Sequence, residues 1–240
     1  MKILALDTTQ EYCSVALAVE SELYTREELA PRSHTELILA QVEAVLAEAG
    51  LLLRQLDALA FGRGPGSFTG LRIAAGVVQG LALGADLPVA PVSSLAAMAQ
   101  GIYRNNNQTT NICAAFDARI QEVYWGNYQL IDGVMQSVTE EAVSSPDDLY
   151  LPDEGTWLAI GSGWAAYPQM QERLAGRLSG VMGDTVPLAR DMIPAAEQII
   201  ANGETVSAEA AIPVYLRQKV AQTIEEREQL KAATVNQRQG

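Results

Sequence analysis

Short apolar runs alternate with polar, turn-forming stretches through the first hundred residues. Apolar runs of about four to eight residues are typical of β-strands, whereas apolar positions three or four apart indicate an amphipathic helix. Strands are predicted over residues 2–7, 13–19, 23–29, 56–61 and 88–93. Helices are predicted over residues 34–49, 69–85 and 95–103. The order is therefore a three-stranded meander followed by alternating helices and strands.

The second half of the chain repeats this order of elements more weakly. A polar, aperiodic stretch at 104–111 (RNNNQTTN) separates the halves. Beyond it, strands are predicted over 112–116, 122–129, 133–138 and 157–161, and helices over 146–149, 165–174 and 191–201. The predicted domains are a first lobe of 1–106, a second lobe of 107–217 and a polar C-terminal tail or helix of 218–240. This repeated order predicts an α/β fold of two ribonuclease-H-like lobes, the duplicated architecture of actin, Hsp70 and sugar kinases.

The helix predicted over 34–49 carries signals at both ends. Ser33 and Glu36 form the S-x-x-E pattern of a capping box, and Gly50 follows the last periodic residue. One apolar face of this helix carries Ile38, Val42, Val45 and Ala49.

A glycine-rich stretch at 61–72 (FGRGPGSFTGLR) joins a predicted strand to the helix over 69–85. It lacks the Lys-Ser/Thr of a nucleoside-triphosphate loop, and its glycines do not match G-x-G-x-x-G. Two interpretations stay open. The stretch is a tight connection that Pro65 stiffens and Thr69 caps, or the helix N-terminus behind it holds an anion.

The helix over 69–85 places glycine at every fourth residue of one face, at Gly76, Gly80 and Gly84. Each glycine costs about 1 kcal/mol relative to alanine, so close approach of another backbone must offset that cost. A second, apolar ridge carries Ile73, Val77 and Leu81. From the residues alone, the neighbour is either the lobe's own sheet or a partner's helix.

The charge of the chain bears on its partners. With 29 acidic and 16 basic residues the net charge is −13, so most of the surface repels a phosphate backbone. The N-terminus lacks the pattern of a signal peptide, and no apolar run approaches the roughly 20 residues of a membrane span. The two cysteines, Cys13 and Cys113, fit buried reduced thiols. We therefore expect a cytoplasmic protein without a membrane partner.

Few residues could support catalysis. His34 is the only histidine, and the chain contains neither H-E-x-x-H nor G-x-S-x-G, so no metal site and no hydrolase centre is predicted. Asp7, followed by Thr8 and Thr9, and Asp117 end corresponding strands of the two halves. In actin-like folds such carboxylates face phosphates and magnesium, so these four residues are candidates to face a nucleotide. The glycine of a tight phosphate turn is missing beside both.

Several motifs resemble one bacterial family in order along nearly the whole chain. They are ILALDTT (3–9), RSHTEL (32–37), GRGPGSFTGLRIAAG (62–76), PVSSL (91–95), DAR with EVYWG (117–126) and PVYLR (213–217). The family is TsaB, also called YeaZ, the dimerisation subunit of the tRNA threonylcarbamoyladenosine machinery, and GPGSFTGLR is its most specific motif. The resemblance implies a duplicated actin-like fold. In the related catalytic subunit TsaD, a metal-binding histidine pair follows the stretch similar to PVSSL, whereas residues 93–98 here contain no histidine.

The resemblance implies a non-catalytic scaffold that binds and supports TsaD, joined by the ATPase subunit TsaE, in modifying the adenosine beside the anticodon. It also implies homodimers when the chain is alone, contact with tRNA only through the complex, and no support for an inherited glycoprotease label. No cofactor is expected to bind this chain tightly, and ATP with magnesium at a subunit junction is left open. The predicted partner-binding residues are Ile38, Val42, Val45, Arg72, Ile73, Gly76, Val77, Gly80, Leu81 and Gly84. The competing hypothesis is an actin-like small-molecule kinase or nucleotide hydrolase that uses Asp7 and Asp117.

Overall fold

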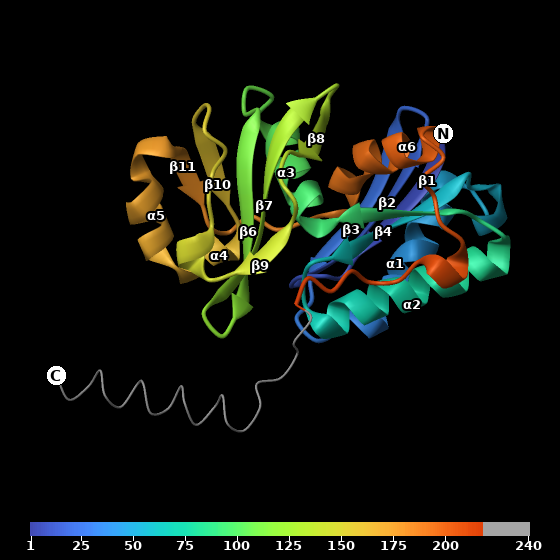
Figure 1. The fold of residues 1–240 in the computed structure, drawn as a ribbon. Coiled ribbons are helices and arrows are strands. Elements are labelled where there is room, and N and C mark those ends of the chain that lie inside the picture. The colour runs from blue at the N-terminus through green and yellow to red at the C-terminus, as the bar shows by residue number, and fades with distance from the viewer. Residues whose placement is uncertain (218–240) are drawn as a thin grey trace.

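The computed structural model describes residues 1–217, and the predicted tail of 218–240 lies outside the described residues. Two β-sheets stand side by side with helices packed on their faces (Figure 1). The first sheet has the order β3-β2-β1-β4-β5, and the second has the order β11-β10-β6-β7-β8 with β9 paired to β7. Read from its other edge, the second order corresponds strand by strand to the first, so the repeated pattern in the sequence is a repeated sheet topology.

The elements of the first half agree closely with the prediction. The strands are β1 (Lys2–Asp7), β2 (Tyr12–Val19), β3 (Glu22–Leu29), β4 (Ala58–Gly64) and β5 (Val89–Ser93). The helices are α1 (His34–Ala49), α2 (Phe68–Ala85) and α3 (Ser94–Asn105), with a 3-10 turn η1 (Leu53–Gln55). β1 pairs antiparallel with β2 and parallel with β4.

The second half contains two strands that the sequence pattern missed. The strands are β6 (Asn111–Arg119), β7 (Glu122–Ile131), β8 (Val134–Ser137), β9 (Ala142–Ser144), β10 (Trp157–Ile160) and β11 (Leu178–Met182). The helices are α4 (Ser162–Ala166), α5 (Pro168–Leu174) and α6 (Ile193–Ala201). The 3-10 turns are η2 (Pro146–Asp148), η3 (Ala175–Arg177), η4 (Ala189–Met192) and η5 (Ala208–Ala210). The missed strands, β9 and β11, have three and five residues and only half-buried or exposed side chains, so neither shows a clear alternation.

The alternation of side chains along β1 explains why both faces of the first sheet are covered. Leu4 and Leu6 point into a core shared with α1 and α2, whereas Ile3 and Ala5 point into a core shared with α6. All four side chains are fully buried. A strand buried on both faces reads as one continuous apolar run, as observed for residues 3–6.

The two lobes exchange covering helices, which corrects the predicted domain boundaries. α3 belongs to the first lobe by sequence, yet its Leu95 and Met98 lie in the core of the second sheet with Ile112. η4 and α6 belong to the predicted second lobe, yet they pack on the first sheet. The predicted second lobe of 107–217 is therefore too long at its C-terminal end, because the chain has returned to the first sheet by residue 189.

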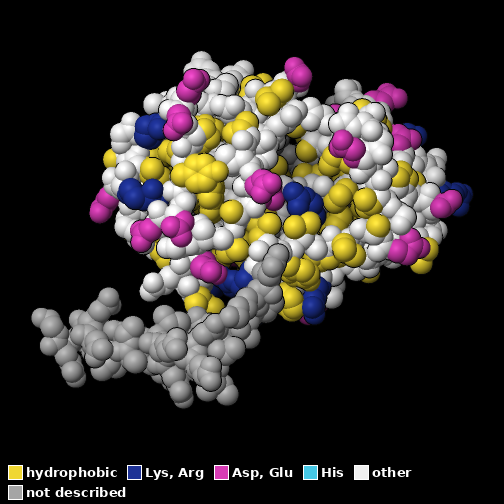
Figure 2. Space-filling view, viewed as in Figure 1, with side chains coloured by type: hydrophobic (Ala, Val, Ile, Leu, Met, Phe, Trp, Pro, Cys, Tyr) yellow, Lys and Arg dark blue, Asp and Glu magenta, His cyan; other side chains and the backbone are white. Residues whose placement is uncertain are grey.

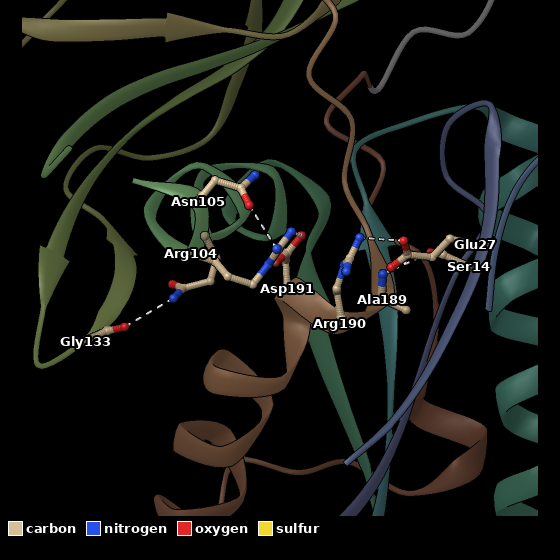
Figure 3. A network of polar contacts seen from close by, with 9 residues as sticks. Ser14, Glu27, Arg104, Asn105, Gly133, Ala189, Arg190 and Asp191 are labelled. Atoms are coloured by element: carbon tan, nitrogen blue, oxygen red, sulfur yellow. Dashed lines mark hydrogen bonds and ion pairs between the residues drawn. The ribbon is translucent and has the colours of Figure 1, made fainter. Parts of the chain in front are cut away.

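Polar contacts fasten this returning segment to both lobes (Figure 3). Arg104 of α3 donates to the buried carboxylate of Asp191 at 2.6 Å, and Arg190 donates to Glu27 of β3 at 2.6 Å. The backbone N–H of Ala189 donates to Ser14 Oγ at 2.9 Å. Adjacent residues of η4 thus contact α3 on one side and the first sheet on the other.

Two predicted helix caps differ in detail. Ser33 stands at the N-cap of α1 but its side chain makes no capping hydrogen bond, so the predicted capping box is wrong. Gly50 ends α1 in the left-handed conformation (φ 65°), as predicted. α2 begins one residue earlier than predicted, and its cap is Ser67, whose Oγ accepts from the Gly70 N–H, rather than Thr69.

Candidate protein interface

α2 has two different sides, and they answer the question that its sequence leaves open. Ala74, Val78 and Ala82 are buried in the core beneath the helix. On the opposite side, a Cβ atom added to Gly76, Gly80 or Gly84 would have no heavy atom within 4 Å. The glycine face therefore does not approach the lobe's own sheet and lies open on the surface.

The glycines of the 61–72 stretch have a different role from those of the glycine face. A Cβ atom on Gly70 would lie 1.9 Å from the Thr8 carbonyl oxygen, and one on Gly66 would lie 2.5 Å from the Thr9 carbonyl oxygen. The Thr8 hydroxyl also donates to the Gly70 carbonyl at 2.7 Å. These glycines let the turn and the start of α2 lie directly on the Thr8-Thr9 backbone. The stretch is therefore a tight connection, as one of the two interpretations predicted, although its cap is Ser67 and not Thr69.

Exposed apolar side chains accompany the glycine face of α2. Leu83 is 71% exposed and Phe68 is 48% exposed, and Leu39 on neighbouring α1 is 50% exposed. On the face drawn in Figure 2, hydrophobic side chains gather over the first turns of α2, beside the junction of the lobes. The sequence prediction missed these three residues, although Leu83 was identifiable because it lies three residues after Gly80 on the glycine face.

The predicted partner-binding residues divide into two groups. Arg72, Gly76, Gly80 and Gly84 are exposed, and Ile73, Val77 and Leu81 are half-buried against the core under α2. Ile38, Val42 and Val45 of α1 are 1%, 3% and 0% exposed and pack in the core of the first lobe. Their prediction as surface contacts is wrong, because the apolar face of α1 covers its own sheet.

The hydropathy of α2 fits an exposed contact helix. Among the described helices, α2 alone is long and apolar enough to cross a membrane by length and composition, with 18 residues and a mean hydropathy of 1.3. Only 33% of its residues are buried. Its buried side lies in the core of the first lobe, as expected of a helix in a folded domain. Two large apolar side chains of α2, Phe68 and Leu83, are left exposed by the described chain.

A cleft of about 370 Å³ separates the lobes beside the start of α2. It is lined by residues 65–68, by residues 116–119 at the end of β6 and by residues 214–217. Of the four candidate nucleotide-facing residues, only Asp117 lines this cleft. Its carboxylate pairs with Arg119 at 3.0 Å and accepts from the Tyr167 hydroxyl at 3.1 Å.

Asp7, Thr8 and Thr9 are buried, so their prediction as phosphate-facing residues is wrong. Asp7 accepts from the backbone N–H of Thr9 at 2.8 Å and from its hydroxyl at 2.9 Å. The space opposite the carboxylate is filled by backbone, because a Cβ atom on Gly62 would lie 2.0 Å from Asp7 Oδ2. Burial raises the pKa of Asp7 to about 7, against the opposing effect of the two hydrogen bonds from Thr9. A carboxylate enclosed in this way cannot share a magnesium ion with Asp117 across the cleft.

The serines of the PVSSL stretch also have structural roles. Ser93 caps α3, with its Oγ accepting from the Ala96 N–H at 3.3 Å, and lies 3.4 Å from the Tyr128 hydroxyl. Ser94 and Leu95 are fully buried. These positions contribute a helix start and core packing.

Comparison with known proteins agrees with the motifs. A family model described as "TsaD: tRNA N6-adenosine threonylcarbamoyltransferase" matches residues 22–229. The "tRNA threonylcarbamoyladenosine biosynthesis protein TsaB" of Escherichia coli (strain K12) is 46% identical, over 92% of this chain and 96% of that protein. The chain belongs to the TsaB family. The TsaB of Haemophilus influenzae is 43% identical, over 92% of this chain and 95% of that protein.

The fold is shared with a solved member of the TsaB family. "YeaZ from Pseudomonas aeruginosa" superposes with a TM-score of 0.84 at 44% identity, over 90% of this chain and 99% of that one. The duplicated actin-like α/β fold and the resemblance to TsaB are both confirmed. This chain thus combines two lobes of one topology with an apolar helix whose glycine face is open.

Proposed function

We propose that this chain is a non-catalytic scaffold in tRNA threonylcarbamoyladenosine biosynthesis, and that it binds a TsaD-like catalytic subunit through the exposed side of α2. The supporting observation is the open glycine face at Gly76, Gly80 and Gly84, flanked by exposed Leu83. No other part of the described chain packs against these three glycines, so packing within the lobe does not explain them. The helix cost of three glycines is offset when a partner's backbone packs closely against them.

The same side of α2 supports self-association when the chain is alone. A homodimer would cover the apolar surface that a heterodimer covers, so the two assemblies compete. A stable complex needs upward of about 1,200 Å² of buried surface, so the interface is expected to extend beyond α2 onto neighbouring exposed residues such as Leu39 of α1. A TsaE-like ATPase joins the assembly, and the tRNA contacts the complex rather than this acidic chain, which carries a net charge of −13. The assembly works in the cytoplasm.

No catalytic role is assigned to this chain. A solved relative is described as "an uncharacterized protein with similarity to peptidase YEAZ". Peptidase chemistry needs an activated nucleophile or a metal, and the only histidine, His34, is buried at the start of α1. The kinase hypothesis loses its main residue because Asp7 lies outside the cleft.

The proposal is tested by placing a large charged side chain on the glycine face. Gly80 is exposed with open space around it, so Gly80→Arg should fold and even favour the helix by about 0.5 to 1 kcal/mol. In size-exclusion chromatography the variant should run as a monomer and fail to co-elute with the TsaD-like subunit. The matched control is Gly176→Arg, which makes the same change in open space on the second lobe. A folded Gly80→Arg variant that still forms both complexes overturns the assignment of α2.

A further inference from the structure

The PVYLR segment lies across the junction of the two lobes. Residues 211–217 follow η5 and run along α2 towards the second lobe (Figure 1). Four of these residues, 214–217, form one wall of the interlobe cleft. We refer to residues 211–217 as the strap.

The first part of the strap is fastened to the first lobe. The Gln79 side chain donates to the Ala211 carbonyl at 3.1 Å, and the Val214 N–H donates to the Arg63 carbonyl at 2.8 Å. Gly64 has a φ of 111°, and a Cβ atom there would lie 2.9 Å from the Val214 carbonyl oxygen. Glycine is therefore required at the point where the strap contacts β4.

Aromatic and cationic side chains continue this attachment onto α2. The rings of Phe68 and Tyr215 lie 5.8 Å apart, and the Arg72 guanidinium lies 3.9 Å from the centre of the Phe68 ring. Arg72 Nε also donates to the Tyr215 hydroxyl at 3.4 Å. The strap is thus linked to the first turns of α2.

The last residue of the strap reaches the second lobe. Arg217 Nε donates to Glu122 Oε2 at 2.8 Å, and a second guanidinium nitrogen donates to the same oxygen. That nitrogen also donates to the carbonyls of Ala118 and Arg119 at 3.0 and 3.3 Å. The guanidinium lies 5.8 Å from the centre of the Tyr124 ring. The Arg217 side chain therefore binds both the Glu122 carboxylate and the backbone carbonyls at the β6–β7 turn.

A second interlobe ion pair lies close to the strap. Arg63 of β4 contacts the Glu141 carboxylate at 3.3 Å, and Glu141 accepts from the buried Tyr128 hydroxyl at 2.7 Å. The Arg63 carbonyl is the group that holds Val214. Beside the cleft, the lobes are therefore linked at each end of the segment 214–217.

We propose that the strap is a clamp that fixes the two lobes in a single relative arrangement, with Arg217 as its positioning residue. The chain crosses between the lobes elsewhere only through α3 and the segment before η4, within residues 1–217. Packing and polar contacts of α3 and η4 join the lobes at those crossings, and the strap adds a link across the cleft. A consequence, which rests on the proposed function, is that the partner bound to α2 meets the second lobe in a preformed position.

Distance measurement between spin labels tests the clamp without any partner. Labels are placed by Leu23→Cys on β3 and Glu154→Cys on the second lobe, both exposed positions. The natural cysteines, Cys13 and Cys113, are buried and leave the labels site-specific. The labelled chain is diluted with excess unlabelled chain, so that only distances within one chain are measured. With the natural strap, the distribution of distances between the two labels should be single and narrow. In Arg217→Ala this distribution should become broad.

Two further variants make the result decisive. Glu122→Gln keeps the shape of the Arg217 partner but removes its charge, and it should also broaden the distribution. Arg173→Ala is the matched control, because its guanidinium donates to the carbonyls of Pro146 and Leu149 within the second lobe and should leave the distance unchanged. If Arg217→Ala and Glu122→Gln keep the narrow distance, the clamp is overturned. If Arg217→Ala does not fold, the distance distribution of Glu122→Gln alone decides whether the clamp stands.

Chromatography with the TsaD-like subunit then separates the clamp from the proposed function. Broadened distances with weakened association support both the clamp and its consequence. Broadened distances with unchanged association leave the clamp standing and overturn only the consequence for the partner. A failure of the proposed function itself appears in the Gly80→Arg test, which leaves the strap intact.

Discussion

Replacing Asp7 by asparagine tests whether this carboxyl is a buried structural group or an ionised ligand. Asp7 is 1% exposed, and burial raises its pKa from 3.8 to about 7 in the folded chain. Asparagine keeps an oxygen that can accept both hydrogen bonds from Thr9 but cannot be charged. We expect Asp7→Asn to fold and to lose one component of the pH dependence of stability.

The direction of that component follows from the two pKa values. The folded chain binds the Asp7 proton more tightly than the unfolded chain does, so this proton stabilises the fold fully below about pH 4. The stabilisation is lost as the pH rises through about 7. Between about pH 5 and about pH 8, the free energy of unfolding of the natural chain should fall by about 2 to 3 kcal/mol relative to that of Asp7→Asn.

Urea unfolding of both chains across this pH range measures the difference. The free energy of unfolding of Asp7→Asn minus that of the natural chain should increase as the pH rises. The control is Asp153→Asn, which removes an exposed carboxylate, and it should follow the natural chain. Parallel pH profiles for Asp7→Asn and the natural chain would refute the reasoning. Tight binding of ATP with magnesium by the natural chain, lost in Asp7→Asn, would restore the kinase hypothesis.

Two further predictions follow from the glycines and the cysteines. Gly70→Ala places a methyl group against the Thr8 carbonyl and should destabilise the chain by about 1 to 3 kcal/mol. Gly76→Ala lies in open space within the same helix and should stabilise the chain by about 0.5 to 1 kcal/mol. Thermal unfolding of both variants checks this contrast. Burial raises the pKa of Cys13 to about 12 and also raises the pKa of Cys113. Neither thiol should therefore react with an aromatic disulfide reagent at about pH 8 until the chain is unfolded by urea. Rapid reaction of the native chain would contradict the burial of the two thiols.

Local patterns in the sequence identified most of the elements. β1 spans the predicted residues 2–7, and α1 spans the predicted residues 34–49. Patterns of this kind depend on neighbouring residues, so they are visible without knowledge of the fold. The short strands β9 and β11 escaped because pairing with distant strands, rather than local alternation, defines them.

The sequence by itself determined the family, the repeated order of elements and the scarcity of catalytic residues, because motifs, periodicity and residue types are properties of the chain alone. Only the tertiary structure decided which apolar faces are covered. The apolar face of α1 at Ile38 and Val42 is core, whereas the glycine face of α2 is open. It also decided that Asp7 is enclosed by backbone, and that Arg217, the last described residue, fastens the two lobes together. Periodicity shows that a face is apolar, but what covers it depends on segments far away in the sequence.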